Sequence, residues 1–154
     1  MLPEGAKAPN FRLTDLDGTL VTLDSVLSHG KALLVFFKIS CPTCQLALPF
    51  LERLHRSGRL PVFGISQDDA GDTRDFCRAF GLTFPMLLDP ANQKYPASNA
   101  YQITNVPSLF VVGADHGIEW TLNGFSRKRL EDLGRGVDAS IFRPEDRAPE
   151  SKPG

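Results

Sequence analysis

The pattern of hydrophobic and polar positions predicts two fully buried strands joined through a helix. Residues 32–37 (ALLVFF) are an uninterrupted apolar run, and residues 60–66 (LPVFGIS) are a second one. Short runs of this kind are typical of strands that are covered on both faces. Between them, Leu46, Phe50 and Leu54 recur every fourth residue, which gives a helix one apolar face. A strand–helix–strand unit predicts that the two strands are parallel.

The segment before this unit predicts a β-hairpin. Apolar residues alternate with polar ones over residues 11–16, resume over 20–23, and are separated by Asp17-Gly18. Asp-Gly between two short apolar segments is a strong hairpin signal, because both residues tolerate the positive φ angles of a tight turn. We therefore expect an N-terminal hairpin extension of the sheet.

Downstream of the unit, helix and strand signals alternate. We expect a helix that stops at Gly81, an extended segment at 84–88, a short helix within 94–102, and strands at 106–112 and 118–122. A last helix, capped by Ser126, carries an apolar stripe at helical spacing: Leu130, Leu133, Val137 and Ile141. Prolines and charges alternate after that. We expect one domain over residues 1–141 and an extended, solvated tail over 142–154.

Composition and charge exclude several classes of partner. The chain has 154 residues, of which 42% are hydrophobic, and its formal net charge is −1. With the basic residues dispersed, we expect neither nucleic acid nor an anionic membrane as a partner. No apolar run approaches the roughly 20 residues that cross a bilayer. No signal peptide is visible, so we expect a cytoplasmic protein, or a periplasmic one if a leader has been removed. We also expect a monomer.

The chemistry points to Cys41-Pro42-Thr43-Cys44, which lies directly between the first buried strand and its helix. A helix N-terminus has unpaired N–H groups and roughly half a unit of positive charge, which favours a thiolate. Cysteines at i and i+3 share one face of the first turn, so their sulfurs can close a disulfide. Pro42 suits this turn because its missing N–H has no partner there. The stretch predicts a redox-active thiol pair.

A structural disulfide or half of a metal site would use the same two thiols. Zinc or copper needs two further ligands, and His29, His55 and His116 are scattered without ligand spacing, so we expect no metal. The third cysteine, Cys77, lies on the apolar face of a predicted helix, and we expect a buried or half-buried bystander there.

The order of these elements resembles the thioredoxin superfamily, and within it the TlpA-like and redoxin branch, which is related to AhpC/TSA proteins. The resemblance covers about residues 5–138. Three segments carry it: GAKAPNF at 5–11 with Asp17-Gly18, the run 33–37 leading into the cysteine pair with Pro49 in the following helix, and YQITNVPSLFV at 101–111. The resemblance implies an α/β thioredoxin-like fold, with a central mixed sheet flanked by helices.

The resemblance also implies a thiol–disulfide oxidoreductase. Cys41 would attack a protein disulfide, Cys44 would resolve the mixed disulfide, and Pro107 would be cis. The implied partners are a protein disulfide or dithiol substrate and a protein reductant, and the implied cofactor is none besides the Cys41–Cys44 disulfide. The residues that would contact the substrate are Pro42, Thr43, Val106 and Pro107.

Three positions depart from the family's pattern. Ser40 replaces a common Trp before the first cysteine, Val35 replaces a buried Asp of thioredoxin proper, and Ala47 replaces a Glu of many TlpA-like proteins. Both candidate proton acceptors are therefore missing. Water, the tail or Lys38 would take that role, or disulfide exchange would be slow at neutral pH.

Two other functions use the same thiols. A peroxiredoxin-type peroxidase would use Cys41 alone, but that family needs Thr or Ser three residues earlier, where this chain has Lys38. The alternative from another functional class is a non-catalytic protein that uses these thiols to bind or deliver a metal.

Overall fold

The computed structural model describes all of residues 1–154, and its central strand is β3 (Ala32–Phe37). Every residue of β3 is buried, as the apolar run predicts. β3 pairs in parallel with β4 (Val62–Ser66), and β4 pairs in parallel with β5 (Met86–Leu88). On its other side β3 pairs antiparallel with β6 (Ser108–Val112). The sheet is therefore mixed, as expected.

Antiparallel strands complete the sheet at both edges, and its order is β2-β1-β5-β4-β3-β6-β7, with β1 antiparallel to β5. β7 (Ile118–Asn123) pairs with β6 at one edge. At the other edge, β1 (Arg12–Asp15) pairs with β2 (Leu20–Thr22), and the Asp15 carboxylate accepts N–H bonds from within the turn that joins them. The predicted N-terminal hairpin is confirmed.

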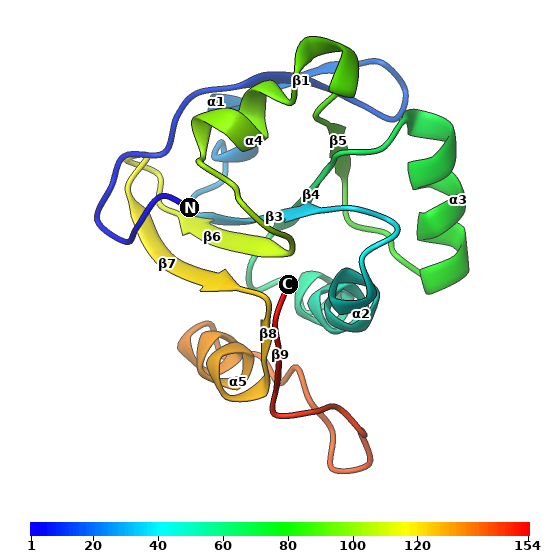
Figure 1. The fold of residues 1–154 in the computed structure, drawn as a ribbon. Helices are drawn as coiled ribbons and strands as arrows, with labels where there is room; N and C mark the ends of the chain where they lie inside the picture. Colours follow the sequence, from blue (N-terminus) through cyan, green and yellow to red (C-terminus); the bar gives the residue numbers. More distant parts are fainter.

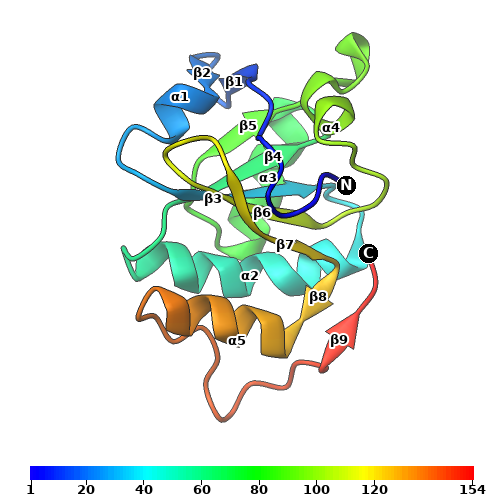
Figure 2. The same ribbon diagram turned by 90° about the vertical axis from the view of Figure 1, so that its left-hand side faces the viewer.

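Helices cover both faces of the sheet (Figures 1 and 2). One face carries α2 (Pro42–Arg56), α3 (Ala70–Phe80) and α5 (Arg127–Gly136). The opposite face carries α1 (Leu23–Val26) and α4 (Pro96–Ala100), which follows the short 3₁₀ turn Ala91–Gln93. Because side chains of β3 alternate between the faces, they divide between two hydrophobic cores. This strand order, with helices on both faces of the sheet, is that of a thioredoxin-like fold.

The last helix is shorter than its apolar stripe predicts. α5 ends at Gly136, because the backbone turns there: the N–H groups of Val137 and Ala139 both bond to the Gly134 carbonyl, and Asp138 has a φ of 58°. Ile141 lies beyond the helix but is buried in the same core as the rest of the stripe. The apolar stripe packs on the core, but the expectation of a helix reaching Ile141 is wrong.

The C-terminal segment differs from the solvated tail that we expected. It returns along α5 and α2, and β9 (Ser151–Lys152) pairs antiparallel with β8 (Phe125–Ser126) (Figure 2). The ring of Phe142 lies 4.6 Å from that of Phe50, centroid to centroid. The segment is extended, as its prolines predict, but it lies on the domain.

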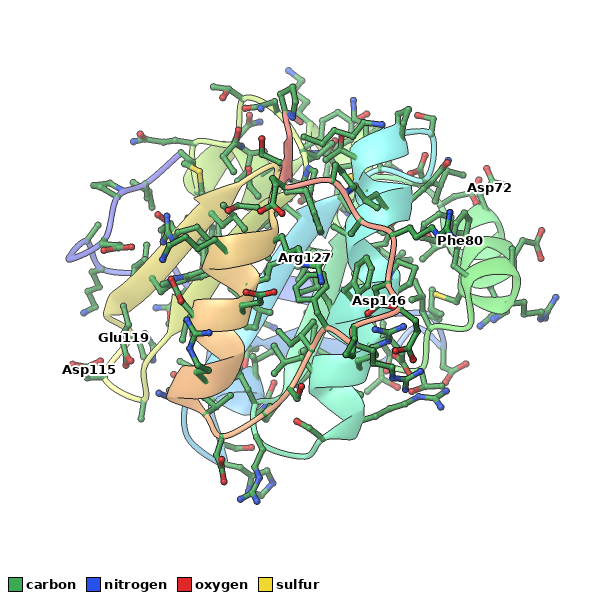
Figure 3. All side chains as sticks on the ribbon, turned by 90° about the horizontal axis from the view of Figure 1, so that it is seen from below. Asp72, Phe80, Asp115, Glu119, Arg127 and Asp146 are labelled. Atoms are coloured by element: carbon green, nitrogen blue, oxygen red, sulfur yellow. The ribbon has the colours of Figure 1, made fainter.

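An ion pair fixes the middle of this segment. Asp146 lies where the chain passes α2 (Figure 3), and its carboxylate accepts two hydrogen bonds from the Arg53 guanidinium, at 2.6 Å and 3.1 Å. Arg53 also donates to the Ile141 carbonyl at 3.1 Å. The hydrogen bond from Arg53 lowers the pKa of Asp146 to about 2, so the pair stays charged over the physiological range.

Candidate active site

The cysteine pair lies where α2 begins. Cys41 is the N-cap residue of the helix, and its sulfur accepts the backbone N–H of Cys44 at 3.1 Å. The Cys41 side chain is partly exposed, whereas Cys44 is completely buried. The strand β3 runs directly into this turn, as the sequence predicts. A partner can therefore reach the first sulfur but not the second.

Burial also separates the two thiols chemically. Burial in the apolar core, followed by the hydrogen bond with Cys41, raises the pKa of Cys44 far above the ordinary thiol value. Cys44 is consequently a protonated thiol at neutral pH. A nucleophile must be a thiolate, so Cys44 needs to lose its proton before it can react.

A second loop faces the pair. The Val106–Pro107 peptide bond is cis, as the resemblance implies, and the Val106 carbonyl accepts the Cys41 thiol at 3.5 Å. This loop is brought there because β6, which follows it, is the antiparallel neighbour of β3. Pro107 itself is buried, and Val106 is half-buried. The site thus places Cys41, Pro42, Thr43 and Cys44 beside Val106 and Pro107.

Two further residues shape the loop before Cys41. The Asp68 carboxylate accepts the Ile39 N–H at 2.8 Å, and the Gln45 side chain donates to the Ile39 carbonyl at 2.9 Å. The sequence analysis did not identify either residue. A signal existed for Asp68: it follows β4, and the ends of two parallel strands meet at one edge of a sheet.

A cavity of about 220 Å³ adjoins the Val106 loop. It is lined by Lys38, Gln67, Tyr95, Ser98, Asn99 and residues 103–106. Lys38, one of the candidate substitute proton acceptors, thus lines the same cavity as residues of the Val106 loop. Most of the residues that line the cavity are polar.

The departures from the family's pattern leave the buried thiol without an acceptor. Val35 and Ala47 both belong to the hydrophobic cluster that contains Cys44, and Ser40 is exposed. Glu52 is the buried carboxylate of α2, but it lies two helical turns away, roughly 12 Å along the axis. Its oxygens are already bonded to other partners. Neither position at which the family carries a carboxylate therefore offers an acceptor for the Cys44 proton.

The third cysteine lies apart from this arrangement on α3. Cys77 is half-buried, and burial together with the charge of Glu52 raises the pKa of its thiol.

Nowhere in the chain do three or more His, Cys, Asp or Glu side chains gather as metal ligands would. None of the helices is long and apolar enough to cross a membrane.

A cysteine pair that begins a helix behind the central strand of a mixed sheet, faced by a cis-proline loop, defines a thioredoxin-like protein. The chain belongs to the AhpC/TSA family, whose profile matches residues 5–121. The resemblance that the sequence suggested is confirmed.

The relatives found by sequence similarity include proteins named as thiol-disulfide oxidoreductases and proteins named as peroxiredoxins. Thiol-disulfide oxidoreductase ResA of Geobacillus kaustophilus is 27% identical over 139 residues, which cover 88% of this chain and 76% of that protein. A Mycobacterium tuberculosis protein, whose name provisionally assigns it to the peroxiredoxins, is 38% identical over 105 residues, 65% of this chain and 66% of that protein.

Solved structures share the fold. The thioredoxin domain of a thiol-disulfide oxidoreductase from Bacteroides vulgatus superposes with a TM-score of 0.78 at 18% identity, covering 89% of this chain and 99% of that one. Peroxidoxin BcpB of Mycobacterium tuberculosis superposes with a TM-score of 0.72 at 21% identity, covering 86% and 94%. The predicted thioredoxin-like architecture is confirmed.

Proposed function

We propose that this protein is a thiol–disulfide oxidoreductase in which Cys41 attacks a protein disulfide and Cys44 resolves the mixed disulfide. The observation that carries the proposal is the asymmetry of the pair: the Cys41 sulfur is accessible at the N-cap of α2, where it accepts the Cys44 backbone N–H at 3.1 Å, and the Cys44 side chain is fully buried. The ResA protein of Geobacillus kaustophilus, whose name states this reaction class, aligns with 88% of the chain.

The reaction has two exchange steps. The Cys41 thiolate attacks one sulfur of the substrate disulfide; that bond breaks, and the other substrate sulfur leaves as a thiolate. Cys44 then loses its proton and attacks the Cys41 sulfur. The mixed disulfide breaks, the substrate leaves with two reduced sulfurs, and the protein holds a Cys41–Cys44 disulfide. A dithiol protein returns it to the reduced form by the reverse exchange.

The proposal gives the other residues of the site the following roles. Pro42, Thr43, Val106 and Pro107 contact the substrate around the attacked sulfur. Because Val35 and Ala47 offer no acceptor, the departing substrate thiolate or water takes the proton of Cys44. The reaction needs no cofactor beyond the cysteine pair. The partners are therefore proteins with a disulfide or a dithiol.

A second candidate function is peroxide reduction by Cys41, which the 38% identical Mycobacterium tuberculosis relative favours. In that reaction peroxide would oxidise the Cys41 thiolate to a sulfenic acid and leave as water. Lys38 stands where peroxiredoxins carry Thr or Ser, and the buried Cys44 directly behind Cys41 is the arrangement of a dithiol exchanger. Disulfide exchange is the better supported reaction.

Insulin reduction with dithiothreitol as the reductant tests the proposal. We expect Cys41→Ser to abolish catalysis and Cys44→Ser to lower it at least tenfold, because the mixed disulfide then goes unresolved. Cys77→Ser is the matched control and should keep wild-type activity. If both Cys41→Ser and Cys44→Ser remain fully active, the proposal is wrong. Oxidation of Cys41 by stoichiometric hydrogen peroxide that outpaces disulfide exchange would favour the peroxidase instead.

A further inference from the structure

The end of the chain lies at the start of α2, beside the cysteine pair (Figures 1 and 2). Residues 150–154 reach it as an extended segment, which we call the strap. Residue by residue, the strap pairs with β8: Lys152 opposes Phe125, and Ser151 opposes Ser126. The ladder continues into α5, whose Arg127 N–H donates to the Glu150 carbonyl at 2.9 Å.

The strap makes two contacts with residues of the candidate active site. The buried Thr43 hydroxyl, between the two cysteines, donates to the Pro153 carbonyl at 2.6 Å. Gly154 lies against the Val106 loop: a Cβ at Gly154 would stand 2.3 Å from the Val106 carbonyl oxygen and 3.0 Å from the Asn105 side-chain nitrogen. That oxygen is the one that accepts the Cys41 thiol.

The groups that the strap bonds to or covers are groups that an extended protein segment would use. The Thr43 hydroxyl offers a donor, the Val106 carbonyl offers an acceptor, and β8 offers the hydrogen-bonding edge of a strand. We call this set the docking strip. Since each edge group pairs with one strand at a time, the strap and a substrate segment exclude each other.

We propose that the strap is a displaceable, built-in competitor of the protein substrate at the docking strip. This inference rests on the proposed disulfide exchange at Cys41. In the resting protein the strap covers the strip; a substrate segment binds only in molecules whose strap has lifted. The apparent affinity for substrate is then lowered by the fraction of molecules with an open strip.

The two parts of the C-terminal segment differ in the way such a device requires. Residues 142–146, the base of the segment, are fixed, because Phe142 packs on Phe50 and Asp146 pairs with Arg53. Its end is exposed at every residue from Ser151 to Gly154 and pairs through only two residues of strand. The strap can therefore lift while its base keeps it close enough to return.

At two glycines, a backbone atom lies so close that adding a side chain would displace the strap, and these positions therefore allow the strap to be tested. Gly154 is one; Gly124 is the other, since a Cβ there would stand 2.7 Å from the Lys152 carbonyl oxygen. Both obstructing atoms are backbone atoms, so an added methyl group must displace the strap. Gly136, with nothing within 4 Å, matches Gly154 in lacking a positive φ. Gly18, with a φ of +82° and open surroundings, matches Gly124, whose φ is +78°.

The experiment measures KM and kcat for insulin reduction in the full chain with each substitution. We expect Gly154→Ala and Gly124→Ala to lower KM three- to tenfold with kcat within twofold of wild type. The controls Gly136→Ala and Gly18→Ala should leave KM unchanged. Thermal melting followed by circular dichroism checks that all four variants are folded.

The outcomes separate this inference from the proposed function. Wild-type protein without insulin reductase activity would remove the proposed function and the strap with it. Active wild-type protein whose KM is the same in Gly154→Ala, Gly124→Ala and their controls would overturn the strap alone. A KM that rises in Gly154→Ala would also overturn it, because the strap would then be helping substrate to bind.

Discussion

At the scale of residues, the site depends on the different surroundings of two identical side chains. Cys41 caps a helix and contacts the Val106 carbonyl, while Cys44 is closed off by the core and by the first sulfur. In thioredoxin-like proteins with a buried Asp or Glu near the pair, that carboxylate can take the resolving proton. Here Val35 and Ala47 occupy those positions. The resolving step should therefore depend on solvent pH.

We expect the rate of resolution to rise about tenfold per pH unit between pH 6 and pH 9. Burial raises the pKa of Cys44, so its thiolate is a small fraction throughout this range, and the fraction grows tenfold with each unit. The measurement mixes reduced protein with the aromatic disulfide 5,5′-dithiobis(2-nitrobenzoate) and follows the second thiolate released. Cys77→Ser should behave identically, and Cys44→Ser should lack this phase. A plateau near pH 7 would reveal an acceptor that this account does not contain.

At the scale of elements, a buried carboxylate in the third turn of α2 ties this helix to its neighbours. The first turn of α2 carries the cysteine pair, and its third turn carries Glu52, which is buried. Glu52 accepts the Thr83 N–H at 2.8 Å, the Thr83 hydroxyl at 2.6 Å and the Phe84 N–H at 3.2 Å. Although burial works in the opposite direction, the bonds from Thr83 and Arg56 hold the pKa of Glu52 below its ordinary value. The carboxylate ties α2 to the segment before β5.

Replacing this carboxylate should lower stability. We expect Glu52→Gln to reduce the free energy of unfolding at pH 7 by about 1–3 kcal/mol, because an amide presents one acceptor where two are used. The matched control is Glu131→Gln, whose partly exposed side chain pairs with Arg127 in α5; it should cost about 0.5 kcal/mol or less. Urea unfolding measures both. Equal losses in the two variants would contradict a structural role for the Glu52 cluster.

The same cluster has a pH signature. A carboxylate whose pKa is depressed by folding contributes stability above its unfolded pKa and loses it as the pH falls through the folded one. The difference between wild type and Glu52→Gln should thus be full at pH 7 and shrink as the pH falls below 4.5, the ordinary pKa of this group.

Elements also show where sequence patterns were sufficient. The run 32–37, the i, i+4 spacing after Cys44 and the Asp17-Gly18 turn each fixed a local structure that the fold contains. Apolar periodicity misplaced the end of α5, because Ile141 is buried after a turn rather than along a helix. Burial alone does not distinguish those two routes.

At the scale of the whole molecule, the position of the C-terminal segment is the feature that the sequence predicts least well. This segment lies at the site although it is far from the cysteine pair in the sequence. Cys41 and Pro107 were identified because each has a local signature. The position of the C-terminal segment depends on Asp146 meeting Arg53, a partner 93 residues earlier in the chain. Proline and charge make such a segment read as solvated, and only the assembled surface of α2 and α5 shows otherwise. The same holds for Thr43 and Pro153, 110 residues apart.

The central claim is that Cys41 attacks and Cys44 resolves, and trapping the intermediate tests it most directly. Oxidised insulin is mixed with reduced Cys44→Ser or Cys41→Ser protein, quenched with acid, and examined by intact mass and peptide mapping without reductant. We predict a covalent adduct of one insulin molecule in Cys44→Ser, attached at Cys41 and released by dithiothreitol, and no adduct in Cys41→Ser. An adduct at Cys44 or Cys77 in Cys41→Ser that forms as fast, or no adduct in Cys44→Ser, would contradict the account.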